Sequence, residues 1–169
     1  PPVSRWLEGC GRDPVARLTV LLLIALRGNI FLYQGEELGL PQAPVPFEML
    51  QDPEAIANWP ATLGRDGTRT PMPWRGDAPN AEFSTGEPWL PVDPDHLLLA
   101  VDRQERDQNS ILHLTRRLIA LRKVHPALCS GAIKILDVPA RLLAFEREGG
   151  GERLLCLFNL GSEAADWPL

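Results

Sequence analysis

The sequence has few of the residues that build metal and redox sites. It contains three cysteines and three histidines among 169 residues, and no two cysteines form a C-x-x-C pair. The spacing gives no support for zinc-binding or thioredoxin-type functions, so we expect neither a metal site nor a cofactor. Widely spaced cysteines, odd in number, are typical of a reducing compartment, and we predict a cytoplasmic protein.

Positive charge in excess and a long apolar run are also missing. The net charge of -5 argues against nucleic acid or an anionic membrane as the main partner, because both select for basic surface. The longest apolar stretch, residues 18–26 with one threonine inside it, is too short to span a bilayer. We therefore predict no nucleic-acid partner and no membrane partner for a globular chain of one domain or parts of two.

Proline, in contrast, is abundant. Many of the seventeen prolines lie between positions 41 and 94, where regular structure should be scarce. A loop of this length in a compact protein is usually either functional or disordered. Three tryptophans, Trp59, Trp74 and Trp89, lie in the same stretch, and disordered segments are poor in aromatic residues. We therefore predict an ordered loop over residues 41–107.

An αβ step precedes this loop. Asp13-Pro14 predicts the start of a helix, and Arg27-Gly28 predicts its end. The helix is apolar on nearly all sides, so we expect it to be well buried. Residues 29–33 then predict a short buried strand. A helix that leads through one glycine into an apolar strand is typical of a parallel α/β protein.

A second helix and a set of strands follow the loop. Ser110 or Asn109 is the expected cap of the helix, and Pro126 is expected to stop it. Beyond Gly131 the texture changes to three strand-like runs with a glycine-rich turn before the last. The predicted strands are residues 132–138, 141–148 and 153–160.

Several strings resemble a known family. Residues 32–39 (LYQGEELG) resemble the segment at the eighth barrel strand of alpha-amylase superfamily enzymes. Residues 64–74 (GRDGTRTPMPW) are similar to a loop of the alpha-glucosidase, oligo-1,6-glucosidase and trehalose synthase branches. Further matches extend the resemblance, in order, from about residue 3 to about residue 128. Pro73 favours the alpha-glucosidase branch, because glutamine is frequent at that position in the other two.

The resemblance implies an α/β fold followed by an all-β one. Residues 1–128, with the loop 41–107, would be the C-terminal part of a (β/α)8 TIM barrel, and residues 129–169 an incomplete antiparallel β-sheet domain. It also implies retaining hydrolysis by carboxyl groups about 5–5.5 Å apart. The family carries its carboxylates in Gly-x-Arg-x-Asp, in a strand-end Glu and in Asn-His-Asp, and none of these occurs here. We therefore expect a C-terminal fragment that has no catalytic residue of its own and is inactive alone.

Arg69 is the first candidate for sugar binding. In the family, the arginine of this Arg-Thr-Pro-Met motif lies on a loop that borders the pocket, and the fork of a guanidinium suits hydroxyls and carboxylates. The alternative is an arginine that only fixes the loop through a carboxylate such as Asp66. Arg65 and Asp66 are expected to find partners within the loop itself.

Tyr33, Gln34 and Glu36 are the other candidates for sugar binding. Tyr33 and Gln34 end the predicted strand, where they face either the sugar pocket or a buried hydrogen-bonding partner. Glu36 and Glu37 do not suit a catalytic pair, because neighbours on an extended segment point to opposite sides. Capping of the next segment is the alternative role for Glu36. His96 is expected to be an ordinary loop histidine.

The resemblance implies a parent enzyme with an oligosaccharide substrate of the maltose or isomaltose type. The first hypothesis is an alpha-glucosidase that hydrolyses terminal alpha-linked glucose. Two alternatives stay open: a trehalose synthase or related transglucosidase, and a non-catalytic alpha-amylase-like binding protein. We also expect the isolated chain to self-associate, because helix 18–26 and the free strand edge would expose apolar and hydrogen-bonding surface.

Overall fold

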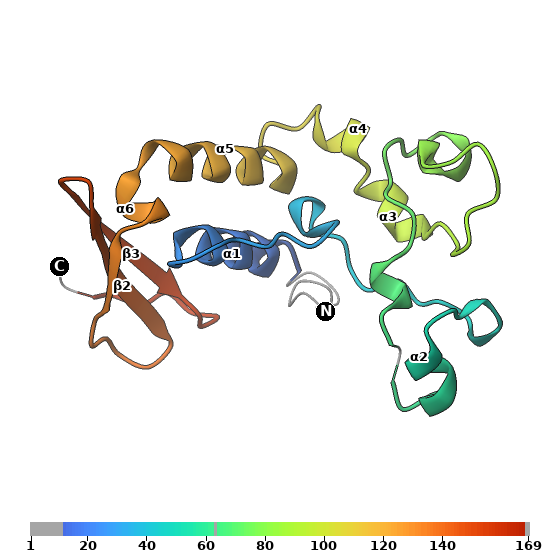
Figure 1. Cartoon of the computed structure of the whole chain (residues 1–169), viewed down its shortest axis with the longest axis horizontal. Helices are drawn as coiled ribbons and strands as arrows, with labels where there is room; N and C mark the ends of the chain where they lie inside the picture. The colour runs from blue at the N-terminus through green and yellow to red at the C-terminus, as the bar shows by residue number, and fades with distance from the viewer. Residues whose placement is uncertain (1–11, 63, 168–169) are drawn as a thin grey trace. The chain divides into compact units, whose positions relative to one another are not determined.

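The computed structural model describes residues 12–62 and 64–167 (Figure 1). The chain divides into two compact units, each made of two segments. Unit 1 consists of residues up to 19 together with 32–115, and unit 2 consists of residues 20–31 together with residues from 116 onward. The residues of two helices are divided between the units, because each helix begins in unit 1 and ends in unit 2: α1 (Arg12–Ala25) and α5 (Ile111–Val124).

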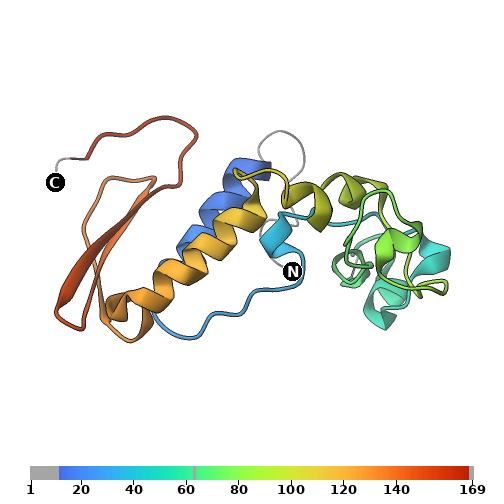
Figure 2. The ribbon, with the colours of Figure 1, turned by 90° about the horizontal axis from the view of Figure 1, so that it is seen from above.

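Unit 1 is made of short helical turns joined by ordered loop, which Figure 2 shows as a series of single turns. The longest of the helices between residues 41 and 107 has six residues, and proline or glycine interrupts the chain repeatedly up to residue 94. The predicted ordered loop is thus found as a chain of brief turns. The short helical elements of unit 1 are η3 (Glu36–Leu38), η4 (Phe47–Met49), α2 (Pro53–Asn58), η5 (Asp66–Thr68), η6 (Pro79–Glu82), α3 (Pro94–Leu98) and α4 (Val101–Gln104).

Side-chain hydrogen bonds to the backbone hold unit 1 together. The Gln104 amide donates to Leu38 O and Leu99 O, each at 2.9 Å, and its oxygen accepts from Leu112 N at 3.0 Å. Leu38 and Leu112 belong to one apolar cluster, so this single side chain satisfies three backbone groups beside that cluster. Ser110 caps α5 as predicted, because its hydroxyl oxygen accepts from His113 N at 3.3 Å.

His96 is not an ordinary loop histidine. It lies in α3 and is fully buried, with Nε2 at 2.9 Å from Pro41 O and Nδ1 at 3.3 Å from the Thr70 hydroxyl. Since Pro41 O can only accept, Nε2 is the donor of that hydrogen bond. The ring thereby joins two distant parts of the loop, an arrangement that a local sequence pattern does not reveal.

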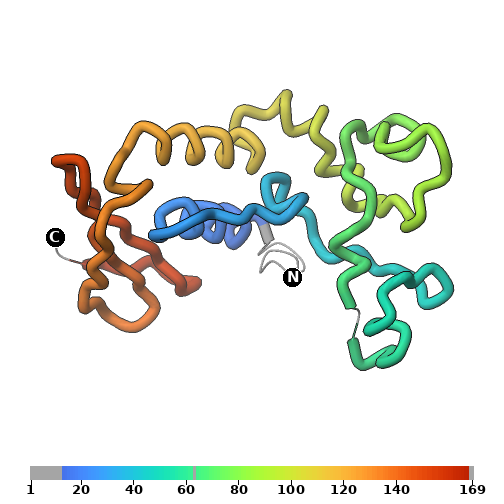
Figure 3. The backbone as a smooth tube through the Cα atoms, in the orientation of Figure 1, coloured from blue at the N-terminus to red at the C-terminus, as the bar shows by residue number. Residues whose placement is uncertain are grey.

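The predicted strand at residues 29–33 is wrong for this chain. Figure 3 traces the segment as an extended run, but none of the described strands pairs with it. Phe31, expected to be buried, is 83% exposed. The physical reason is that a strand needs hydrogen-bonded neighbours on at least one side, and the described sheet contains only β1 to β3.

Helix α1 is buried along one face and not all around. Its first residue is Arg12, so Asp13 lies in the first turn, and Gly28 follows the helix with φ +110°. Leu21 remains 39% exposed, which corrects the expectation of burial on nearly all sides. Ala25 is buried at the end of the helix, and three further buried residues recur every four positions and therefore form one stripe: Ala16, Val20 and Ile24.

Unit 2 contains the predicted antiparallel sheet, in the order β1-β2-β3. Gly150 and Gly151, both with positive φ, form the tight turn between β2 and β3. Phe145 and Phe158 lie on the same face of the sheet and stack with ring centroids 5.6 Å apart. The three-strand prediction is confirmed. The elements after α5 are α6 (Pro126–Cys129), β1 (Ala132–Ile135), β2 (Leu142–Gly149) and β3 (Glu152–Asn159).

Candidate functional site

The turn η5 brings three of the four predicted sugar-binding residues to one place in unit 1. Gln34 Nε2 donates to Thr68 O at 3.2 Å, and the Tyr33 phenol oxygen lies 3.4 Å from the Thr68 hydroxyl. Arg69 directly follows the turn, and its backbone N–H donates to Asp66 O at 2.8 Å. Residues 35 positions apart in the sequence therefore converge on Thr68, which is 2% exposed.

Glu36 lies beside this group but has a different local geometry from the predicted one. It belongs to the 3-10 turn η3, which Gly35 and Gly39 flank with φ of 85° and 66°. The expectation that Glu36 and Glu37 lie on an extended segment is therefore wrong, because two left-handed glycines fold the chain into a turn there. The Glu36 carboxylate accepts from Tyr33 N at 2.8 Å, an amide that precedes η3, so this hydrogen bond is not the expected capping of the next segment.

The alternative role of Arg69, a loop fixed through Asp66, is not what the structure contains. The fully buried Asp66 carboxylate accepts instead from Gln51 N at 2.6 Å and Asp52 N at 2.7 Å, both through Oδ2. Within residues 12–62 and 64–167 the part-buried Arg69 guanidinium has no carboxylate partner. A guanidinium carries five N–H donors and is suited to bind hydroxyl groups of a ligand.

A second buried carboxylate, that of Asp52, binds Arg65, the residue that directly precedes η5. Asp52 is 1% exposed and makes a two-pronged ion pair with Arg65, with Nε–Oδ2 and Nη2–Oδ1 distances of 2.9 Å. It also caps α2 through Glu54 N and accepts from Arg65 N. The hydrogen bonds from the Arg65 side chain are the main reason that the pKa of Asp52 is held well below its usual range, against the opposing effect of burial.

Asp52 and Asp66 thus hold the segments around η5 in place. Both carboxylates are buried, so we do not count them among the ligand-binding groups. Arg65 and Asp66 were predicted to find partners within the loop; they do so, but with Asp52 and with backbone amides. Asp52 directly before Pro53 is a recognisable helix-start signal that the sequence offered. Nothing in local spacing marks Thr68, because its partners come from a segment more than thirty positions away.

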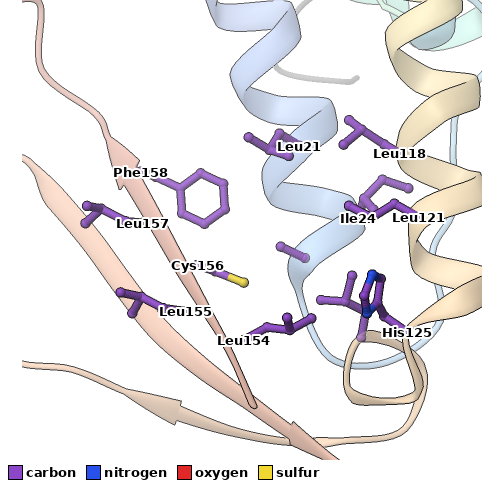
Figure 4. Close-up of a pocket in the computed structure, with 12 residues that line it drawn as sticks. Leu21, Ile24, Leu118, Leu121, His125, Leu154, Leu155, Cys156, Leu157 and Phe158 are labelled. Atoms are coloured by element: carbon purple, nitrogen blue, oxygen red, sulfur yellow. The ribbon is translucent and has the colours of Figure 1, made fainter. Parts of the chain in front are cut away.

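Unit 2 has a cavity of a different character. It has a volume of about 290 Å³, and Figure 4 shows Leu154, Cys156 and Phe158 on the side of β3 that faces the helices. Its polar groups are the His125 ring and the Cys156 thiol, whose pKa is raised by burial. An apolar wall of this kind offers few partners for the hydroxyls of a sugar, so the candidate site stays with the Thr68 turn.

Comparison with known proteins assigns the class. The alpha-amylase family, in its catalytic domain, matches residues 3–131, and the chain therefore belongs to the alpha-amylase family. A probable alpha-glucosidase of Rhizobium meliloti is 47% identical over 96% of this chain and 30% of its own length. A glucan 1,6-alpha-glucosidase of Streptococcus pneumoniae is 32% identical over 92% of this chain and 32% of its own length.

The fold is shared with solved structures of similar proteins. The crystal structure of the alpha-glucosyl transfer enzyme XgtA matches with a TM-score of 0.88 and 46% identity, over 98% of this chain and 32% of that one. The predicted family and fold class are thereby confirmed. The chain spans about a third of the length of these relatives. Sugar binding by Arg69, Tyr33, Gln34 and Glu36 and the boundary between residues 128 and 129 stay predictions.

Proposed function

We propose that this chain is part of an alpha-glucosidase, which removes terminal alpha-linked glucose from oligosaccharides of the maltose or isomaltose type by a retaining mechanism. Residues 1–128 would belong to its barrel and residues 129–169 to its β-domain. The chain would contribute sugar-binding groups, while the reacting carboxylates would come from another part of the enzyme. We further propose a cytoplasmic location; none of the described helices is long and apolar enough to cross a membrane.

The observation that carries the proposal is the convergence on Thr68. Tyr33 and Gln34 contact Thr68 through a phenol and an amide, and Arg69, with its guanidinium, directly follows Thr68 in the chain. The neutral phenol and amide both donate and accept hydrogen bonds, and the positively charged guanidinium donates them. Such a set suits the many hydroxyls of a sugar. The names of the similar proteins, alpha-glucosidase and glucan 1,6-alpha-glucosidase, point to the same class of substrate.

Glucosyl transfer is the second candidate function, and one observation favours it. The solved structure that matches with a TM-score of 0.88 is that of an alpha-glucosyl transfer enzyme. Hydrolysis and transfer would share the bound sugar and differ in the acceptor, water or a hydroxyl compound. The sugar-binding groups of this chain would serve either reaction.

Product analysis separates these functions. The protein in which this chain is joined to the rest of its catalytic domain is incubated with maltose and with isomaltose, and the products are resolved by chromatography. Release of glucose alone supports the glucosidase, and new oligosaccharides or trehalose support transfer. Binding of maltose without any product would support the non-catalytic alternative. The 169-residue chain alone should give no product, and turnover by it would contradict the absence of catalytic carboxylates.

Arg69 gives the sharpest test of the site. Arg69→Ala should lower kcat/KM on maltose about 10- to 100-fold, the effect of losing a hydrogen bond from a charged donor. Arg75→Ala is the matched control, because Arg75 lies in the same unit and pairs with Asp77 at the surface. It should leave kcat/KM within about 2-fold. Equal kinetics for the two variants would remove Arg69 from the site.

A further inference from the structure

We infer that Thr68 is a positioning residue, which sets Tyr33, Gln34 and Arg69 in the geometry that binds the sugar. This inference rests on the proposed function for its sugar-binding part. Thr68 itself is 2% exposed and has its polar groups engaged within the protein, so it acts through its neighbours and does not reach a ligand.

Each polar group of Thr68 has a separate task. Its hydroxyl donates to Arg65 O at 2.8 Å, which uses the only hydroxyl proton. The Tyr33 phenol, 3.4 Å away, therefore has to be the donor in the contact between the two oxygens. The Thr68 carbonyl accepts from Gln34 Nε2 at 3.2 Å. One residue thus orients both side chains that end the 29–34 segment.

The turn η5, which carries Thr68, is held in place by Asp66 and by close packing at Gly67. Asp66, the first residue of η5, is fully buried and accepts from two backbone amides at 2.6 and 2.7 Å. Its carbonyl accepts from Arg69 N, so the turn also sets where the Arg69 side chain begins. The backbone at Gly67 is closely packed, because a Cβ there would meet Ala43 O at 2.3 Å. A turn confined in this way holds Tyr33 and Arg69 in a fixed relation.

The chain offers a direct probe of this arrangement, because Tyr33 is its single tyrosine. In a sample labelled only on tyrosine, one set of ring resonances reports the surroundings of the phenol without any assignment. The matched control is Thr70, a second buried threonine of the same loop, whose hydroxyl contacts His96 Nδ1 and not Tyr33.

The first experiment uses the 169-residue chain and needs no activity. Thr68→Val should shift the Tyr33 ring resonances, whereas Thr68→Ser should keep them near their wild-type positions. Thr70→Val, which also removes one buried hydroxyl, should leave them in place. Unchanged Tyr33 resonances in Thr68→Val would overturn the inference whatever the enzyme does.

The second experiment uses the protein in which this chain is joined to the rest of its catalytic domain. Thr68→Val removes the hydroxyl contacts with Arg65 O and with the Tyr33 phenol, and the loss of the Tyr33 contact should lower kcat/KM on maltose about 2- to 10-fold, mainly through a higher KM. Thr68→Ser should restore the wild-type value, and Thr70→Val should stay within about 2-fold. A decrease of the same size in Thr70→Val would mean general destabilisation and would contradict a positioning role.

A double-mutant cycle closes the test. If Thr68 acts through Tyr33, the combination of Tyr33→Phe and Thr68→Val should lose little more kcat/KM than the worse single variant. Additive losses would overturn the inference. If the wild-type protein neither binds nor converts a sugar, the proposed function fails, and the resonance shifts still decide whether Thr68 positions Tyr33.

Discussion

Among the described residues, the buried charged side chains that satisfy backbone groups carry opposite charges in the two units. In unit 1, the Asp52 and Asp66 carboxylates accept from the amides of residues 51, 52, 54 and 65. In unit 2, Arg147 is fully buried and donates to four carbonyls, and no carboxylate lies among those partners: Ala25 O, Leu128 O, Gly131 O and Ala132 O.

The contrast follows from which backbone groups each unit leaves without a partner. Unit 1 begins many short helices, and the start of each helix leaves N–H groups unpaired, which a carboxylate satisfies. Unit 2 contains the ends of α1 and α6, where carbonyls are unpaired and a guanidinium with five donors suits them. The dipole of a helix favours the same choice, an anion at the start and a cation at the end.

The largest effect is expected for Arg147→Met. The variant leaves several buried carbonyls without donors, and we expect the free energy of unfolding to fall by about 3–5 kcal/mol. Burial lowers the pKa of Arg147, which shows that its charge also carries a desolvation cost that methionine would remove. Urea denaturation measures the outcome, with Arg153→Met at the exposed surface as the control. A loss below about 1 kcal/mol would show that the desolvation cost cancels the hydrogen bonds.

Asp66→Ala should have the next largest effect, about 2–4 kcal/mol, because two backbone amides lose a charged acceptor. Asp66→Asn keeps an acceptor oxygen and removes the charge. If the oxygen is what matters, Asp66→Asn should lose no more than about 1 kcal/mol. Equal losses in the two variants would show that the negative charge itself is needed, and the comparison between the units would then be truly electrostatic.

Smaller and equal effects are expected for two helix caps, one in each unit. Asp93 caps α3 through the amides of Asp95 and His96, and Arg122 donates to the carbonyls of Ile24, Leu26 and Gly28. We expect Asp93→Ala and Arg122→Gln each to lower the free energy of unfolding by about 1 kcal/mol. Thermal unfolding of both variants at equal concentration measures the two losses. A much larger loss for one variant would contradict the expectation that the two caps contribute equally.

The smallest effect is expected for the Asp52–Arg65 ion pair, because the Arg65 side chain is 58% exposed and solvent screens it. The folded-state pKa of Asp52 is depressed, so its contribution is complete above the unfolded pKa of about 4 and is lost as the pH falls below that value. The difference in unfolding free energy between wild type and Asp52→Asn should therefore shrink in acid. In an Arg65→Met background the same difference should depend less on pH.

A good part of the fold was readable from local sequence. The hairpin of β2 and β3 follows from two strand-like runs rich in apolar residues on either side of Gly150 and Gly151, and α5 follows from the Ser110 cap and the Pro126 stop. Residues 29–33 have the composition of a strand and still form none among the described residues, since pairing is not a local property. The family was readable too, because strings such as GRDGTRTPMPW are long and occur in order.

The candidate site divides in the same way. The sequence by itself singled out Tyr33, Gln34, Glu36 and Arg69 by their residue types and motifs. Only the tertiary structure decided that Tyr33 and Gln34 meet Thr68, and that the Asp66 carboxylate accepts from backbone amides and does not pair with Arg69. The reason is physical: helix caps and turns depend on neighbours in the chain, whereas a hydrogen bond across 35 positions depends on how the whole loop closes.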